Sequence, residues 1–124
     1  MTKQTETDLQ ETWETYTSSW QATTEDAKRA LCEKSLSRDC VYTDPLTQAR
    51  GLAELITYML EFHQQIPGGH FVTTEFMAHH DRSIAKWEMR DGNDTVIGDG
   101  VSYGEYDRHG KLVSMNGFFK PPGN

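Results

Sequence analysis

The chain has 124 residues, of which 35% are hydrophobic, 10% aromatic and 25% charged, and its formal net charge is −7. This length suits a single domain with one core, and the aromatic content argues against intrinsic disorder. The acidic balance argues against nucleic acid or an anionic membrane surface as a partner, and no apolar run is long enough to span a bilayer.

Three helices are predicted before residue 70, from apolar residues at helical spacing. The first begins at about Asp8, and its apolar face holds Leu9, Trp13, Tyr16 and Trp20. The second starts at Thr23-Thr24, continues through Ala27, Ala30 and Leu31, and ends at about Leu36. The third follows Gly51 and stops at Pro67-Gly68-Gly69. Its buried face is expected to hold Leu52, Leu55, Ile56, Met59, Phe62 and Ile66.

Strands are predicted where the apolar period changes to two. A short strand at Cys40–Thr43 is stopped by Asp44-Pro45. Four longer strands after Gly69 form an antiparallel meander over residues 71–80, 83–90, 95–106 and 111–119. Helices followed by strands favour an α+β domain with the helices on one face of the sheet. We expect residues 1–124 to form one domain, with frayed ends at 1–6 and 121–124.

The cysteines and histidines give no sign of a disulfide or a metal site. Cys32 and Cys40 match no metal or disulfide spacing, and the first residues lack a signal-peptide pattern, so a cytoplasmic protein with reduced thiols is expected. The five histidines show no metal-ligand spacing. His63 and His70 flank a helix end, where either a surface position or a proton shuttle in a pocket remains open.

Several segments, in their order and spacing, resemble the NTF2-like superfamily over nearly the whole chain. They are Tyr16–Trp20 with the acidic residues that follow, Leu36–Pro45, Gly51–Ile56, Gly100–Tyr103, Tyr106–Leu112 and Gly117–Phe119. The resemblance is to the SnoaL-like and ketosteroid-isomerase-like branch. It implies a cone in which three N-terminal helices pack on a curved, mainly antiparallel sheet and enclose a pocket. It also implies a homodimer through the outer sheet face, where Val101, Tyr103 and Val113 are candidate contacts.

Three residues are the candidate catalytic groups. The resemblance places Asp44 at the position of the isomerase general base, and desolvation in an apolar pocket makes a carboxylate a better base; the alternative is an Asp that caps a turn. Tyr16 matches the tyrosine of the oxyanion hole, with a core aromatic as the alternative. Ser102 stands where the isomerases have a second Asp, and its hydroxyl is a weaker donor. Asp99 is expected on the opposite face of the same strand.

A set of large side chains is expected to divide between the core and the wall that binds the substrate. Its members are Trp20, Tyr42, Tyr58, Phe62, Trp87, Met89, Met115 and Phe118. They suit a hydrophobic, ring-containing ligand. One hypothesis is an enzyme that transfers a proton next to a carbonyl without a cofactor, as an isomerase or a polyketide-cyclase-like protein. The other is a non-catalytic NTF2-like module that binds a small ligand or a protein.

Overall fold

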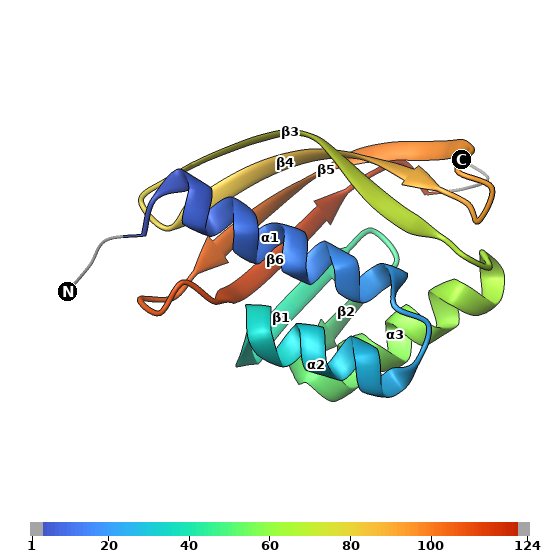
Figure 1. The fold of residues 1–124 in the computed structure, drawn as a ribbon, viewed down its shortest axis with the longest axis horizontal. Helices are drawn as coiled ribbons and strands as arrows, with labels where there is room; N and C mark the ends of the chain where they lie inside the picture. The colour runs from blue at the N-terminus through green and yellow to red at the C-terminus, as the bar shows by residue number, and fades with distance from the viewer. Residues whose placement is uncertain (1–3, 122–124) are drawn as a thin grey trace.

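The structure, a computed structural model, describes residues 4–121. Three helices are present in this range: α1 (Glu6–Gln21), α2 (Glu25–Ser35) and α3 (Gly51–Gln65). The strands are β1 (Leu36–Asp44), β2 (Thr47–Arg50), β3 (His70–His79), β4 (Arg82–Arg90), β5 (Val96–Tyr106) and β6 (Leu112–Phe118) (Figure 1). Of the ends expected to be frayed, residues 1–3 and 122–124 lie outside the described part, whereas Thr5 caps α1 and Glu6 opens it.

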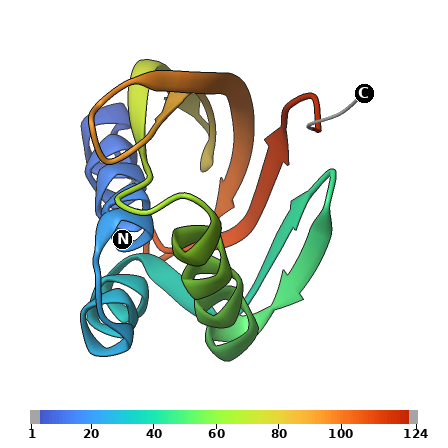
Figure 2. The ribbon, with the colours of Figure 1, turned by 90° about the vertical axis from the view of Figure 1, so that its right-hand side faces the viewer.

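The strands form one mixed sheet in the order β2-β1-β6-β5-β4-β3. The meander from β3 to β6 is antiparallel, as predicted, but β1 runs parallel to β6. Figure 2 shows the sheet bending strongly, so that the β1–β2 hairpin and α3 face the far strands across the interior. The expected α+β architecture, with three helices on a curved and mainly antiparallel sheet, is therefore confirmed.

Strand β2 was not predicted. It has only four residues, three of them polar, and begins two residues after Pro45. It exists because it pairs antiparallel with the end of β1, with Asp44 opposite Thr47. The Asp44 side chain accepts hydrogen bonds from the backbone N–H groups of Leu46 and Thr47, which closes the turn between the two strands.

The three helices follow their predicted patterns with one difference. The four predicted residues of α1 are all buried, and a capping box joins Thr5 and Asp8 at its first turn. In α2 the alanines are exposed, and the face that packs inward holds Lys28, Cys32 and Ser35 instead.

Lys28 is fully buried and connects two helices. Its ammonium group donates to the carbonyl oxygens of Ser19 at 3.1 Å and Trp20 at 3.4 Å, in the last turn of α1. That turn contains no basic residue of its own. A cation at a helix C-terminus offsets the negative end of the helix dipole and satisfies carbonyls that have no partner within the helix. Burial lowers the pKa of Lys28.

The core lies between α1, α2, α3 and the concave face of the sheet. Its buried side chains include Leu9, Trp13, Leu36, Leu55, Ile56, Met59, Leu112 and Met115. Both cysteines are buried in it as free thiols. None of the helices in residues 4–121 is long and apolar enough to cross a bilayer.

Candidate functional site

The interior of the cone contains a cavity of about 1210 Å³. It is bounded by α1, α3 and the sheet, and its wall includes aromatic side chains from each of these elements. They are Trp13, Tyr16, Trp20, Tyr42, Tyr58, Phe62, Phe71 and Trp87. The volume is large enough to hold a small organic molecule, and the aromatic wall suits a ligand that contains rings.

Trp20 stands at the centre of this aromatic wall. Its ring centroid lies 5.6 Å from the ring of Tyr42 and 5.4 Å from that of Phe71. The rings of Tyr58 and Phe62 meet it nearly at right angles, at 5.9 Å and 5.6 Å. Edge-to-face contacts of this kind fix the rings against one another, so the wall keeps its shape without a ligand.

Asp44 lies at the polar end of the cavity and is the only buried carboxylate among residues 4–121. Its Oδ1 atom accepts the backbone N–H groups of Leu46 at 2.8 Å and Thr47 at 3.0 Å. Its Oδ2 atom accepts the hydroxyl groups of Tyr42 at 2.6 Å and Tyr58 at 2.9 Å. Asp44 thus caps the turn through Oδ1 and also contributes a carboxylate to the cavity wall, so both interpretations of this residue apply.

The two tyrosines come from different elements, Tyr42 from β1 and Tyr58 from α3. Burial raises the pKa of Tyr42, and the neighbouring Tyr16 and the negative charge of Asp44 raise it further. Burial, followed by the charge of Asp44, also raises the pKa of Tyr58. Both phenols therefore stay protonated and act as donors to the carboxylate.

Tyr16 reaches the same cavity from α1 and is 3% exposed. Burial raises the pKa of its hydroxyl, and the Trp20 indole N–H opposes this in part. A neutral phenol in a cavity wall can donate a hydrogen bond to a ligand oxygen.

Ser102 lines the cavity from β5, with its Oγ atom 2.9 Å from the indole nitrogen of Trp87. The indole N–H can only donate, so Ser102 accepts this bond and keeps its own hydroxyl proton free to donate to a ligand. Asp99 lies three residues earlier, is exposed, and belongs to the rim.

Gly117 on β6 leaves space where these groups meet. A Cβ atom placed on it would lie 3.5 Å from Asp44 Cβ, 3.8 Å from Ser102 Oγ and 3.8 Å from the Tyr42 hydroxyl. The absent side chain therefore leaves a space that is bordered by the Cβ atom of Asp44 and the hydroxyl groups of Ser102 and Tyr42. The sequence analysis did not identify Gly117 as a site residue; a glycine within a strand was the available signal.

Most of the large side chains predicted to bind substrate line the cavity. Six of them do so as part of its wall: Trp20, Tyr42, Tyr58, Phe62, Trp87 and Met89. Phe118 lies at the rim and is 60% exposed, whereas Met115 is buried in the core and does not line the cavity. On β6 it pairs with Tyr42 and Gly104 of the neighbouring strands, and its side chain belongs to the buried core cluster.

The two histidines near the end of α3 do not line the cavity. The His63 ring contacts the carbonyl oxygen of Gly69 at 3.0 Å. The His70 ring contacts the carbonyl oxygen of Gly68 at 3.1 Å and the Asp94 carboxylate at 3.3 Å. These contacts join the α3–β3 loop to the β4–β5 turn. No group of three or more potential metal ligands occurs within residues 4–121.

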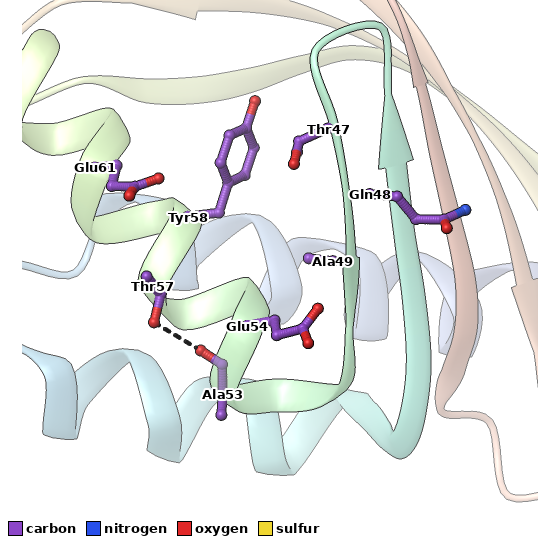
Figure 3. A pocket seen from close by; sticks show the side chains of 8 residues that line it. All are labelled: Thr47, Gln48, Ala49, Ala53, Glu54, Thr57, Tyr58 and Glu61. Atoms are coloured by element: carbon purple, nitrogen blue, oxygen red, sulfur yellow. Dashed lines mark hydrogen bonds between the residues drawn. The ribbon is translucent and has the colours of Figure 1, made fainter.

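A second hollow of about 330 Å³ lies on the outside, between β2 and α3. Figure 3 shows its lining, in which Tyr58 rises from α3 opposite Thr47 of β2 and the Glu54 and Glu61 side chains lie along the helix. It is open, and its lining combines polar side chains with Ala49 and Ala53. Tyr58 lines both spaces, so it forms part of the wall between the hollow and the cavity.

Comparison with solved structures shows the same fold in several bacterial proteins. A candidate isomerase of the SnoaL-like family from Agrobacterium tumefaciens is 20% identical, with a TM-score of 0.85 over 93% of this chain and 99% of that one. A candidate SnoaL-like polyketide cyclase from Jannaschia sp. CCS1 is 14% identical, with a TM-score of 0.75 over 95% and 90%. An LEH-like epoxide hydrolase from M. tuberculosis is 14% identical, with a TM-score of 0.70 over 93% and 84%.

Comparison of the sequence itself gives the family. No curated protein sequence matches the chain closely enough to count as a relative. The model of the SnoaL-like domain matches residues 11–115, which include all the elements from most of α1 to the middle of β6. The chain therefore belongs to the SnoaL-like family.

Proposed function

We propose that this protein is an enzyme that transfers a proton next to a carbonyl group of a hydrophobic, ring-containing substrate. The observation that carries the proposal is that Asp44, the only buried carboxylate among residues 4–121, lies in the wall of an aromatic cavity of about 1210 Å³. A carboxylate kept from bulk water next to an apolar binding wall is the arrangement that general-base catalysis needs.

In this proposal Asp44 is the base, and Tyr16 and Ser102 stabilise the enolate oxygen by donating hydrogen bonds. The aromatic wall around Trp20 holds the rings of the substrate. No step needs a cofactor. Isomerisation of a double bond and an aldol-type ring closure both begin with this proton transfer. The structural neighbours described as an isomerase and a polyketide cyclase support the same reaction class.

The experiment is an exchange assay with ring ketones whose α-hydrogens are acidic, such as 2-tetralone, 1-indanone and a 3-keto steroid. The protein is incubated with each ketone in D₂O, and loss of the α-proton signal is followed by NMR. We expect protein-dependent exchange with at least one ketone. No exchange above the buffer rate for any ketone of the panel would contradict the proposed function.

A non-catalytic ligand-binding module is the second candidate, and one observation favours it. The Asp44 carboxylate already accepts four hydrogen bonds, which is the pattern of a carboxylate that stabilises a turn and a cavity wall. On this alternative the ketones bind, as seen by quenching of tryptophan fluorescence, but their α-protons do not exchange.

We also propose that the protein is a cytoplasmic homodimer. The buried free cysteines support a reducing compartment. Exposed apolar side chains such as Met77 and Phe118, together with partly exposed Val101 and Tyr103, support a contact between sheets. Light scattering at micromolar concentration is expected to give twice the chain mass of 14.2 kDa, and a monomer would contradict the dimer.

A further inference from the structure

Asp44 is the acceptor in all four of its hydrogen bonds. An ionised carboxylate can only accept hydrogen bonds, so both tyrosines give their hydroxyl protons to Oδ2. The backbone N–H groups of Leu46 and Thr47 occupy Oδ1. A carboxylate has about four acceptor positions, and all of them are filled. A substrate proton therefore has no free position on Asp44 to enter.

The oxygen of Tyr42 is the acceptor that the cavity presents instead. Its proton points to Asp44, which leaves its lone pairs for another partner. It borders the space left by Gly117, at the same 3.8 Å as the free hydroxyl of Ser102. A ligand in this space meets an acceptor at Tyr42 and a donor at Ser102.

Tyr58 differs from Tyr42 in position, although it binds the same carboxylate oxygen. Its bond to Oδ2 is longer, at 2.9 Å against 2.6 Å, and its ring forms part of the wall toward the outer hollow. The three atoms nearest to the space at Gly117 belong to Asp44, Ser102 and Tyr42, so the Tyr42 hydroxyl lies closer to it than any atom of Tyr58.

We propose that Tyr42 is a catalytic residue that passes the substrate proton to Asp44. The proposal rests on the proposed function and assigns the contact with the reacting atoms to a phenol. As the substrate C–H bond breaks, its proton bonds to the Tyr42 oxygen, and the proton already on Tyr42 moves to Oδ2 of Asp44. The electron pair of the C–H bond stays on the substrate as the enolate, whose oxygen Ser102 and Tyr16 bind. Asp44 ends neutral and Tyr42 is unchanged.

The two proton movements have to be concerted. Burial raises the pKa of Tyr42, so a free tyrosinate is disfavoured in this cavity. A transfer in which Tyr42 gains one proton as it loses another never charges the phenol. The 2.6 Å bond to Asp44 is short, which suits such a transfer.

The competing route is direct attack by Asp44 after Tyr42 has moved away. The two routes predict opposite effects of Tyr42→Phe. In the direct route the substitution frees an acceptor position and removes a hydrogen bond that stabilises the ionised carboxylate, so the base becomes stronger. In the relay route the substitution removes the atom that receives the proton.

The test measures α-proton exchange of 2-tetralone, or of the most reactive ketone of the panel, with the wild type, Tyr42→Phe and Tyr58→Phe. Tyr58→Phe is the matched control, because it removes one hydroxyl from the same carboxylate oxygen. We expect Tyr42→Phe to lower kcat about a hundredfold or more with little change in KM, and Tyr58→Phe, which loses a hydrogen bond to Asp44 but no proton acceptor, to lower kcat by a factor at least about tenfold smaller. Thermal unfolding shows that each variant is folded at the assay temperature.

Undiminished turnover in Tyr42→Phe would overturn the relay, as would an equal loss in both variants, which indicates a shared electrostatic role. If Tyr42→Phe unfolds, the wild type provides the readout, because the relay moves the exchangeable hydroxyl proton of Tyr42 in the step that breaks the C–H bond. Release of tritium from α-tritiated 2-tetralone is then compared in H₂O and D₂O; slower release in D₂O is expected, and equal rates overturn the relay. An inactive wild type refutes the proposed function and the relay together, whereas an active wild type with active Tyr42→Phe refutes the relay alone.

Discussion

At the scale of single residues, the site is defined as much by a missing side chain as by those present. Asp44 and Tyr42 lie on β1 and Ser102 lies on β5, with β6 between these two strands. Gly117 on β6 is the position where any side chain would come between these groups. The small residue therefore sets how closely a substrate can approach the carboxylate and the two hydroxyls.

Gly117→Ala tests this directly. Its Cβ would sit at ordinary contact distances of 3.5–3.8 Å, so we expect the fold to remain intact. In the proposed reaction the methyl group would take the space of the reacting atoms, so we expect kcat/KM for ketone exchange to fall about tenfold or more. Gly98→Ala on β5 is the matched control, since its nearest neighbour is the flexible Met89 side chain. Equal activity of wild type and Gly117→Ala would show that the reaction does not use this space.

The positions of some site residues could be predicted from the sequence. Asp44 follows a strand and precedes a proline, and the alternation of a strand places Tyr42 on the same face two residues earlier. The hydrogen bond from the Tyr58 hydroxyl to Asp44 could not be predicted, because Tyr58 is 14 residues from Asp44 and lies on another element. Only the packing of α3 against β1 brings the two together.

At the scale of elements, the packing of α1 against α2 is stabilised by the buried ammonium group of Lys28, which α2 places at the C-terminus of α1. Lys28 of α2 binds the last carbonyls of α1, and nothing in the periodicity of α2 distinguishes it from a surface lysine. The parallel pairing of β1 with β6 could not be predicted from the sequence either, because no local pattern marks it. It joins segments about 70 residues apart through contacts that no local pattern encodes.

Lys28→Met keeps the length of the side chain and removes its two hydrogen bonds. The carbonyls of Ser19 and Trp20 lose a partner at a buried position, so we expect the free energy of unfolding to fall by about 1–3 kcal/mol. Lys34→Met, at an exposed position of the same helix, should change it by less than about 0.5 kcal/mol. Urea denaturation measures both values, and a Lys28→Met protein as stable as the wild type would refute the role assigned to Lys28.

At the scale of the whole molecule, two cysteine thiols and four tyrosine hydroxyls are buried in their neutral, protonated form. Burial raises the pKa of Cys40 to about 11 and that of Tyr106 to about 12, and it also raises the pKa values of Cys32, Tyr16, Tyr42 and Tyr58. In the unfolded chain these groups lose their protons at lower pH. Above the ordinary cysteine pKa of 9.0 the folded state therefore holds more protons than the unfolded one, and stability falls as pH rises.

The free energy of unfolding is thus expected to stay level up to about pH 8 and to fall steadily toward about pH 11. Lys28 has the opposite effect on stability, because its pKa is lowered and the folded state therefore releases this proton at a lower pH than the unfolded state. It is a single group, whereas six cysteine and tyrosine groups lower the stability as pH rises. Cys40→Ala should make the fall less steep, since Cys40 alone contributes about 3 kcal/mol. Urea denaturation over this range that shows constant stability would contradict the protonation states described for the interior.

The α+β class was predictable at this scale from three amphipathic helices followed by alternating strands, and the cone with its cavity was implied by the resemblance to the NTF2-like superfamily. Which of the large side chains line the cavity was not predictable, since core and wall residues share the same periodicity. Met115 and Trp87 illustrate the difference: both face inward, yet the first is in the core and the second is in the wall.

The central claim is that Asp44 is the base of a proton-transfer reaction. The most direct measurement is kcat for α-proton exchange of 2-tetralone, or of the most reactive ketone in the panel, by wild type, Asp44→Asn and the rim control Asp99→Asn. We predict that Asp44→Asn lowers kcat by about two to four orders of magnitude while ketone binding persists, and that Asp99→Asn leaves kcat within a few-fold. Exchange by Asp44→Asn at the wild-type rate would contradict the assignment.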